Sequence, residues 1–309
     1  MIATVCLNPC IDKTVSISNF VYGGMNRIIE KREDGSGKGI NVAIAAQRIG
    51  CESAALGFMY QENYAPIEAR LKAEQVPFDF VWCQGAVRTN TKVLDLEKSI
   101  ITEVNESGTP VTDKNIEAMK ASVREWSQKA DLMVFSGSVP AGCGTQIYRE
   151  LMAAACPGIR CILDTEGDRL LEGLKQNPYL IKPNTFELET IVGRSLKTPQ
   201  EVYKAATTLV DRGAQLVAVS MGGDGALITD GSACYYSEAL KVAVKSTVGA
   251  GDSMVAAFCK AIEGGLSLEE VFRYGVAGGT AGVMTEGTEL IRRQDFEQVM
   301  GQVKVQKIA

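Results

Sequence analysis

Histidine is absent from the 309 residues of this chain. A Ser-His-Asp triad, a Cys-His pair and a histidine-bound metal are therefore excluded. Any general base must be a carboxylate, a lysine, a tyrosine or a cysteine, because these are the remaining side chains that exchange a proton. The absence of histidine shortens the list of residues that could act as a catalytic base.

Cysteine is common, with nine residues, but no two of them form a C-x-x-C pair. Most of the nine lie inside apolar segments, where a free cysteine behaves as a small hydrophobic residue. We therefore expect neither a disulfide framework nor a zinc site, and a reducing compartment fits this usage.

Long hydrophobic runs and an excess of positive charge are also missing. No segment approaches the roughly 18 consecutive apolar residues that span a bilayer, and residues 1–5 (MIATV) lack a basic leader. The net charge of −5 argues against nucleic acid or an anionic membrane as a partner. We expect a cytoplasmic protein.

Short apolar segments alternate with helical ones along the chain. This alternation predicts the α/β class, with a central, mostly parallel sheet flanked by helices, and the length fits a single domain over residues 1–309. The predicted strands are residues 2–7, 53–59, 78–82, 131–135, 161–163, 179–181 and 216–219, with a terminal β-section at residues 226–229 and 233–236. The predicted helices are residues 42–49, 64–74, 112–129, 146–155, 169–174, 187–192, 201–212, about 250–262 and 268–284.

Two alternating segments interrupt this pattern as hairpins would. They predict a small β-sheet lid built from two insertions, at about residues 12–34 and 86–105. Arg88 and Asn90 have the same strand parity, so both side chains can face the inner surface of such a lid. An exposed lid edge would also allow a homodimer through the lid, although the sequence does not give the oligomeric state.

Small polar and charged residues recur where the predicted strands end. Examples are Asp12, residues 136–138 (SGS), residues 182–184 (KPN) and residues 220–225 (SMGGDG). Ligands of open α/β sheets bind at the carboxyl ends of the strands. The repetition therefore predicts a ligand cleft along that edge.

The stretch at residues 246–253 (STVGAGDS) combines a glycine-rich turn with the start of a helix. Backbone N–H groups at a helix N-terminus bind anions, and Asp252 places a carboxylate beside the anion site. Phosphate and carboxylate together indicate phosphoryl transfer, and the absence of histidine makes Asp252 one of few possible bases. The alternative is an ordinary helix N-terminus with an acidic first turn.

A second glycine-rich stretch, residues 35–41 (GSGKGIN), precedes the first predicted helix. Its glycines would let the backbone approach a ligand, and Lys38 supplies a charge for a phosphate. It matches neither a Walker A loop nor G-x-G-x-x-G, which argues against a dinucleotide-binding dehydrogenase. The alternative is a flexible turn before a helix.

Together, residues 37–41 (GKGIN) and 247–252 (TVGAGD) resemble the two signatures of the ribokinase/PfkB sugar kinases. The other polar strand ends fall between them in the family's order, over about residues 2–290. The pattern most resembles the branch of 1-phosphofructokinase and tagatose-6-phosphate kinase. Ser36 departs from it, because the branch usually has glycine there. The resemblance implies a ribokinase-like three-layer sandwich with a β-sheet lid.

The resemblance also assigns roles to individual residues. Asp252 would be the general base, and the turn formed by Val248, Gly249, Ala250 and Gly251 the anion hole. The residues implied to bind the acceptor sugar and its phosphate are Asp12, Gly37, Lys38, Gly39, Asn41, Arg88, Asn90 and Ser138. Those implied to bind ATP are Lys182, Asn184, Ser220, Gly222, Gly225, Thr247, Gly249 and Gly251, with Asn184 and Glu187 organising Mg²⁺.

The implied activity is an ATP- and Mg²⁺-dependent sugar-phosphate kinase. Lys38 with Arg88 favours an acceptor that already carries a phosphate, since such an acceptor requires cationic residues. Fructose 1-phosphate is the expected acceptor, which would give fructose 1,6-bisphosphate, and tagatose 6-phosphate is the alternative. A catalytically silent sensor of sugar phosphate or nucleotide is the alternative from another class.

Overall fold

The computed structural model describes all 309 residues and contains two β-sheets. The main sheet is parallel from β5 to β11 and continues with three antiparallel strands. In spatial order its strands are β14 (Gln306–Lys307), β13 (Cys234–Ser237), β12 (Ala226–Thr229), β11 (Leu216–Ser220), β10 (Leu180–Ile181), β9 (Arg160–Asp164), β8 (Leu132–Ser136), β1 (Ile2–Cys6), β4 (Ser53–Glu62) and β5 (Phe78–Ala86). The predicted mostly parallel sheet is confirmed.

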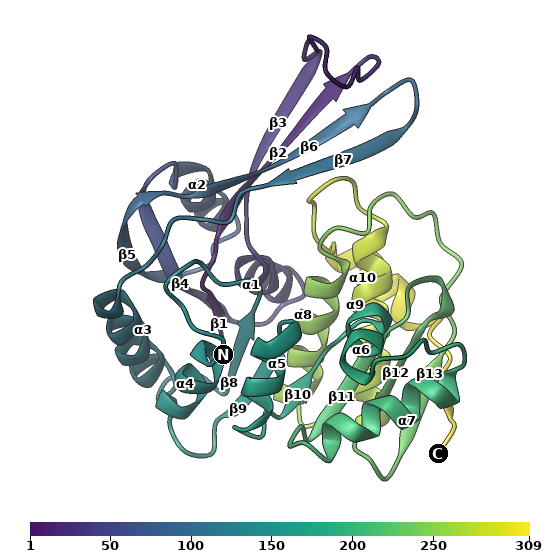
Figure 1. Cartoon of the computed structure of the whole chain (residues 1–309). Coiled ribbons are helices and arrows are strands. Elements are labelled where there is room, and N and C mark those ends of the chain that lie inside the picture. The colour runs from purple at the N-terminus through teal and green to yellow at the C-terminus, as the bar shows by residue number, and fades with distance from the viewer.

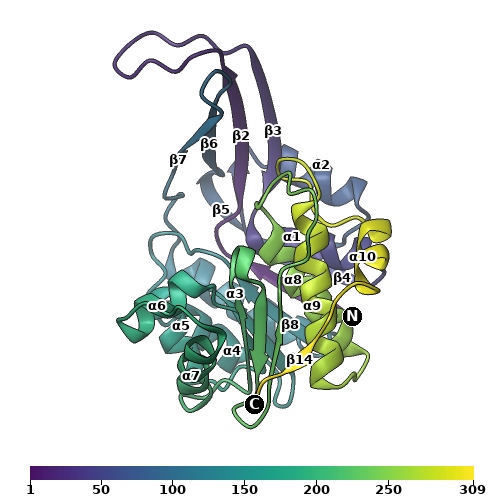
Figure 2. The same ribbon diagram turned by 90° about the vertical axis from the view of Figure 1, so that its right-hand side faces the viewer.

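Helices cover both faces of the main sheet. Figure 2 shows α5, α6 and α7 on one side of the strands and α8, α9 and α10 on the other, which gives the three layers of a sandwich. The helices are α1 (Lys38–Arg48), α2 (Ala65–Ala73), α3 (Asp113–Trp126), α4 (Ile147–Ala154), α5 (Gly167–Leu174), α6 (Thr185–Val192), α7 (Pro199–Val210), α8 (Ala250–Glu263), α9 (Leu268–Val283) and α10 (Arg293–Met300).

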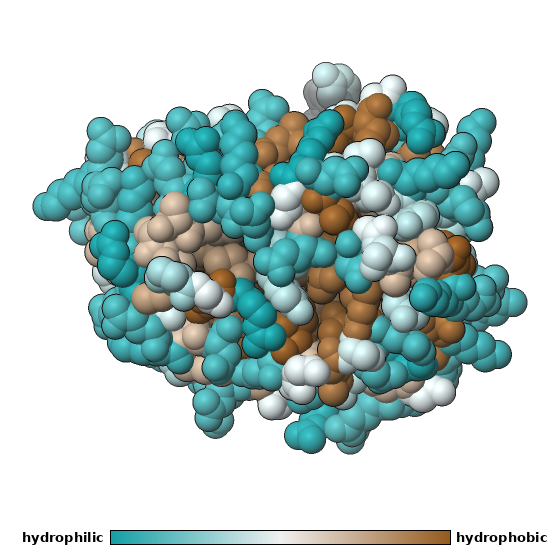
Figure 3. Space-filling model, turned by 90° about the horizontal axis from the view of Figure 1, so that it is seen from below, coloured by the Kyte–Doolittle hydropathy of each residue, from teal (hydrophilic) through white to brown (hydrophobic).

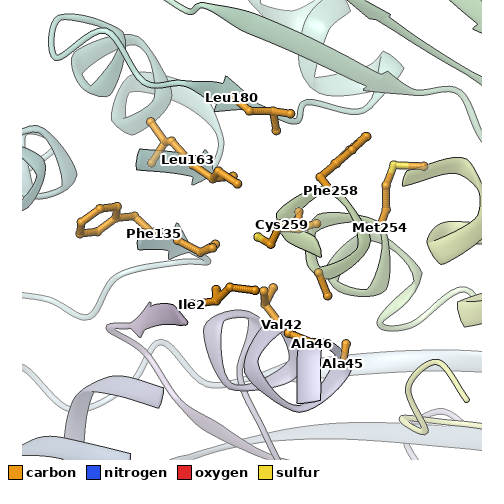
Figure 4. Close-up of a cluster of buried hydrophobic side chains, with 14 of the residues drawn as sticks. Ile2, Val42, Ala45, Ala46, Phe135, Leu163, Leu180, Met254, Phe258 and Cys259 are labelled. Atoms are coloured by element: carbon orange, nitrogen blue, oxygen red, sulfur yellow. The ribbon is translucent and has the colours of Figure 1, made fainter. Parts of the chain in front are cut away.

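The hydrophobic core lies between the sheet and the helices. Every residue of β1 and of β8 is buried, as expected for parallel strands that are covered on both faces. In Figure 4, Ile2 from the sheet lies beside Val42 of α1, and Phe258 of α8 lies on the same side of the strands, whereas Phe135 points to the opposite side. There the ring of Phe135 packs against Tyr148 of α4. The packing of Val42 and Phe258 fixes α1 and α8, the two helices that begin in the glycine-rich stretches, against the same part of the sheet.

A second, four-stranded sheet projects from the main body (Figure 1). Its order is β3 (Glu30–Ser36), β2 (Cys10–Ile17), β6 (Arg88–Asp95) and β7 (Ile100–Asn105), with β2 and β6 parallel. We call it the small sheet. Only residues 7–9 separate β2 from β1, so the small sheet grows directly out of the centre of the main one.

Several predicted boundaries are wrong. The first helix begins at Lys38 rather than at residue 42, because Gly37 adopts a positive φ of 139° and turns the chain into the helix directly. Within the insertion predicted at about residues 12–34, residues 28 and 29 are exposed and precede β3, which begins only at Glu30. Helix α10 and strand β14, which adds an edge to the main sheet, were not predicted.

None of the helices is both long enough and apolar enough to cross a membrane. Figure 3 shows the end of the molecule away from the small sheet, where hydrophilic residues surround a band of hydrophobic ones. Polar and charged residues thus dominate that end.

Candidate active site

A cavity of about 1090 Å³ lies at the carboxyl ends of the parallel strands, between the main sheet, α8 and the small sheet. It is lined by every site residue predicted from the sequence except Gly39. These lining residues are Asp12, Gly37, Lys38, Asn41, Arg88, Asn90, Ser138, Lys182, Asn184, Glu187, Ser220, Gly222, Gly225, Thr247, Gly249, Ala250, Gly251 and Asp252. The structure therefore brings together residues that lie more than two hundred positions apart in the sequence.

Gly39 is buried and does not line the cavity. A Cβ atom at this position would lie 2.7 Å from the carbonyl oxygen of Val5 and 2.9 Å from Cβ of Cys6. In this structure Gly39 therefore serves packing, because it lets the first turn of α1 approach β1 closely.

The anion turn, residues 247–252, forms the N-terminus of α8. Gly249 caps the helix in the left-handed region, with φ of 77°. The N–H of Ala250 donates to the carbonyl of Thr247 at 3.4 Å, whereas the N–H groups of Gly249 and Gly251 donate to no other group of the protein. Free N–H groups and the positive end of the helix dipole together make this turn a site for negative charge.

Asp252 follows in the first turn of α8 and is only 5% exposed. Its Oδ2 accepts a hydrogen bond from Nδ2 of Asn41 at 2.9 Å. Burial raises the pKa of Asp252, while the charge of Lys38 opposes this effect. The result is a carboxylate that lines the cavity and binds a proton more readily than an exposed aspartate does.

Asp164, the last residue of β9, pairs with two lysines. Its Oδ2 lies 3.3 Å from Nζ of Lys38 and its Oδ1 lies 3.3 Å from Nζ of Lys182. Burial alone would raise the pKa of Asp164, but Lys182 and Lys38 outweigh it and hold the pKa below the usual value. Asp164 in turn raises the pKa of Lys38. Asp164 directly follows the strand predicted at residues 161–163, but no role was predicted for it.

Lys182 also lies beside the anion turn. A Cβ atom on Gly251 would be 3.3 Å from Nζ of Lys182. The ammonium of Lys182 thus lies beside the free N–H groups at the start of α8. Its positive charge and the N–H dipoles therefore act on the same part of the cavity.

The small sheet contributes a second polar cluster. Arg88 donates from Nη1 to Oδ1 of Asn90 at 3.1 Å, and its Nη2 lies 3.5 Å from Oγ of Ser138. Asn90 donates to Oδ1 of Asp12 at 3.3 Å, and Asn8 donates to Ser138 at 3.2 Å. Side chains from both sheets are therefore connected at this end of the cavity.

Lys92 belongs to the same cluster and was missed. It lines the cavity, its side chain is 12% exposed, and its Nζ lies 3.9 Å from Oδ2 of Asp12. Residues 88, 90 and 92 alternate along β6 and share one face, so the parity that linked Arg88 to Asn90 could have identified Lys92 as well.

Asn184 and Glu187 form a reciprocal cap at the start of α6. The N–H of Glu187 donates to Oδ1 of Asn184 at 2.8 Å, and the N–H of Asn184 donates to Oε2 of Glu187 at 3.0 Å. Burial raises the pKa of Glu187. The cap leaves Oε1 of Glu187 without a protein donor in a cavity that is also lined by Lys38 and Lys182.

At the other end of the cavity the lining becomes apolar beyond Ser220 and Gly225. Gly225 has φ of 97°, and a Cβ atom there would lie 2.0 Å from the carbonyl oxygen of Ser237, so no other residue fits without a shift. The apolar lining residues at this end are Leu240, Val242, Val244, Val276 and Val283. This lining suits a flat, weakly polar group rather than a phosphate.

Comparison with solved structures supports the fold. Phosphofructokinase-2 from Escherichia coli, in complex with potassium, matches with a TM-score of 0.89 and 32% identity over 97% of this chain and 98% of that one. A structure described as a possible 1-phosphofructokinase from Thermotoga maritima matches with a TM-score of 0.88 and 25% identity over both whole chains. The ribokinase-like fold is thus confirmed.

Sequence comparison gives the family. This chain is 36% identical to a 1-phosphofructokinase of Bacillus subtilis over the full length of both proteins. It is 37% identical to a 1-phosphofructokinase of Rhodobacter capsulatus over 89% of this chain and 88% of that protein. The model of the pfkB family of carbohydrate kinases matches residues 6–293. With its site residues in one cavity and this match over most of its length, the chain belongs to the pfkB family of carbohydrate kinases.

Proposed function

We propose that this protein is an ATP-dependent 1-phosphofructokinase, which converts fructose 1-phosphate to fructose 1,6-bisphosphate. The observation that carries the proposal is the pairing of two sites in one cavity: the anion turn with Asp252, and the cluster around Arg88. Several full-length relatives named 1-phosphofructokinase support the choice of acceptor. Tagatose 6-phosphate remains the alternative acceptor.

In the proposed mechanism, Asp252 accepts the proton of the acceptor hydroxyl as that oxygen attacks the γ-phosphorus of ATP. The bond to the β-phosphate oxygen breaks, and ADP leaves. Negative charge on the transferred group meets the free N–H groups of the anion turn and the ammonium of Lys182. Positioning and charge stabilisation are sufficient, because phosphoryl transfer requires no covalent intermediate with the protein.

Mg²⁺ fits the donor set beside this site. The free Oε1 of Glu187 and the raised pKa of that carboxyl mark a position where a cation would stabilise the ionised form. Mg²⁺ prefers oxygen ligands and retains several waters, so Asn184 and Glu187 would hold it largely through water. When bound, Mg²⁺ would neutralise charge on the phosphate oxygens of ATP.

The acceptor would lie under the small sheet, which we propose acts as a lid. Arg88, Asn90 and Ser138 are joined in one hydrogen-bond network, and Lys92 lies on the same face of β6. A planar guanidinium and neighbouring amides suit the phosphate of the acceptor, whereas Asp12 and Asn41 suit sugar hydroxyls. The nucleotide base would occupy the apolar end, near Leu240 and Val276.

The test is a coupled assay of ADP release with ATP, Mg²⁺ and a panel of acceptors. Fructose 1-phosphate should give the highest kcat/KM in a panel that includes tagatose 6-phosphate, fructose 6-phosphate and fructose. Asp252→Ala should lower kcat by about 10²–10⁴ as the loss of a general base does. No ADP release with any acceptor would favour the silent sensor, and unchanged turnover in Asp252→Ala would remove that residue from the mechanism.

We also propose that two copies of the chain associate through their small sheets. Large hydrophobic side chains are exposed to solvent on the small sheet, in the loop joining β2 to β3 and in the loop joining β6 to β7. These residues are Val21, Tyr22, Met25, Ile28, Ile29, Leu96, Ile100, Ile101 and Val104. Ile101→Lys should give a monomer in sedimentation or light-scattering measurements, whereas Leu266→Lys, away from the small sheet, should not.

A further inference from the structure

Arg70 does not line the cavity, but it contacts Asn41, which does. It lies in α2 and donates from Nη1 to the carbonyl oxygen of Gly35 at 2.6 Å and to Oδ1 of Asn41 at 3.3 Å. Its Nη2 donates to the carbonyl oxygen of Thr288 at 3.1 Å. The guanidinium is therefore fixed by β3, by α1 and by the loop after α9.

This contact determines which way the amide of Asn41 points. Arginine can only donate hydrogen bonds, so the atom of Asn41 that faces Arg70 must be the acceptor, Oδ1. The other atom, Nδ2, then faces Oδ2 of Asp252 at 2.9 Å. A reversed amide would place oxygen against a carboxylate and NH₂ against a guanidinium, and both contacts would be repulsive.

We propose that Arg70 is a positioning residue for phosphoryl transfer, acting through Asn41 on Asp252. By fixing the amide, Arg70 keeps a donor on Oδ2 of Asp252 and leaves Oδ1 to take the proton of the acceptor hydroxyl. The inference rests on the proposed function, in which Asp252 is the base.

Removing the guanidinium leaves the amide of Asn41 held only through Nδ2, by Asp252 and Ser36, so the side chain can shift away from Asp252. The hydrogen bond that favours the ionised form of Asp252 is then weakened, so the pKa of Asp252 rises further, and the ionised base is lost at a higher pH than in the wild type. Other charges constrain both groups. Those facing Asp252 are Lys38 from α1, Asp164 from the end of β9 and Lys182 after β10; those facing Arg70 are Arg48, Asp34, Glu74 and Asp12.

Arg70→Met and Arg48→Met form a matched pair. Arg48 donates to the carbonyl oxygen of Leu290 at 3.0 Å and pairs with Glu74, so it holds the same loop without contacting Asn41. Arg70→Met should lower kcat about tenfold near neutral pH and move the acid limb of the kcat–pH profile up by about one unit, with KM for ATP unchanged. Arg48→Met should leave the acid limb in place, and Arg70→Lys should restore part of the loss.

A double variant separates positioning from a general loss of stability. If Arg70 acts through Asn41, adding Arg70→Met to Asn41→Ala should not move the acid limb further. The proposal is overturned if the two shifts add, if kcat falls equally at every pH, or if Arg48→Met moves the limb as far as Arg70→Met. Arg70→Gln takes the place of Arg70→Met should the latter fail to fold.

A measurement without turnover keeps this inference separable from the kinase proposal. Carbon-13 NMR of labelled aspartate carboxyls, assigned with Asp252→Asn, follows the titration of Asp252 directly. Its midpoint should be higher in Arg70→Met than in the wild type and unchanged in Arg48→Met. Equal midpoints in all three overturn the inference, whereas a shift in a protein that releases no ADP overturns only the kinase assignment.

Discussion

The Nζ atom of Lys182 lies 3.3 Å from Oδ1 of Asp164, and both side chains are almost fully buried. The second carboxylate oxygen of Asp164 lies equally far from Nζ of Lys38. One buried carboxylate thus separates and orients two ammonium groups that line the cavity. Lys182 depends most on this carboxylate, because a buried ammonium without a partner is strongly disfavoured, whereas the side chain of Lys38 is 45% exposed.

Asp164→Asn should therefore destabilise the protein by about 3–5 kcal/mol in urea unfolding at pH 7. The pKa of Asp164 is lowered in the folded protein, so its contribution is fully present above the ordinary pKa of about 4 and is lost as the pH falls below it. The gap between wild type and variant should hold from pH 8 to pH 5. A gap that closes near pH 6 would contradict this assignment. Glu117→Gln, in an exposed pair, is the control.

Asp252→Asn should have the opposite effect on stability. The pKa of Asp252 is raised by burial, so the ionised carboxylate opposes folding above that pKa. The asparagine can still accept from Asn41 and carries no charge. The variant should unfold at a temperature a few degrees higher than the wild type at pH 8, and the difference should shrink as the pH falls, while kcat falls by about 10²–10⁴. A less stable variant at pH 8 would show that the charge of Asp252 is fully compensated.

Gly249 and Gly251 should respond differently to alanine. Gly249 has a positive φ, so Gly249→Ala should lose about 1–2 kcal/mol of stability. Gly251 has no such constraint, but its Cβ would meet Nζ of Lys182 at 3.3 Å. Gly251→Ala should keep a near-normal unfolding temperature and lose about 10- to 100-fold in kcat/KM for ATP. Equal thermal destabilisation of the two variants would contradict this distinction.

Arg88 and Lys38 should differ in which kinetic constant they control. Arg88 lies in the cluster beneath the small sheet, so Arg88→Met should raise KM for the sugar phosphate about 10- to 100-fold with KM for ATP unchanged. Lys38 interacts with Asp164 and Asp252, so Lys38→Met should also lower kcat. Measuring both constants with both substrates checks this, and a pure KM effect for Lys38→Met would confine Lys38 to acceptor binding.

The sequence predicted much of the cleft because parallel strands direct their carboxyl ends to one edge. Ser138, Lys182 and Ser220 come from or directly follow separate strand ends, and all three line one cavity. Asp12 lines it too, but the prediction that it follows a strand end is wrong, because it lies inside β2 of the small sheet. The helix starts were less predictable. In a sequence, glycine predicts the end or interruption of a helix. Gly39 nevertheless lies inside the first turn of α1, because its close contact with β1 outweighs its low helix propensity.

Other site residues could not be predicted because their environment is tertiary. Asp164 becomes distinctive only when Lys38 and Lys182, far apart in the sequence, converge on it. Arg70 resembles any arginine on a short surface helix until the end of β3 and Asn41 are placed beside it. Lys92, by contrast, could have been predicted from strand parity alone.

The position of β1 affects how the chain reaches its folded state. Ile2 pairs with Ser53 on one side and with Leu132 on the other. During synthesis the edge of β1 that pairs with β8 therefore stays unpaired until β8 has left the ribosome. Nascent chains that stall before residue 132 should expose that edge and be the species that chaperones bind most strongly.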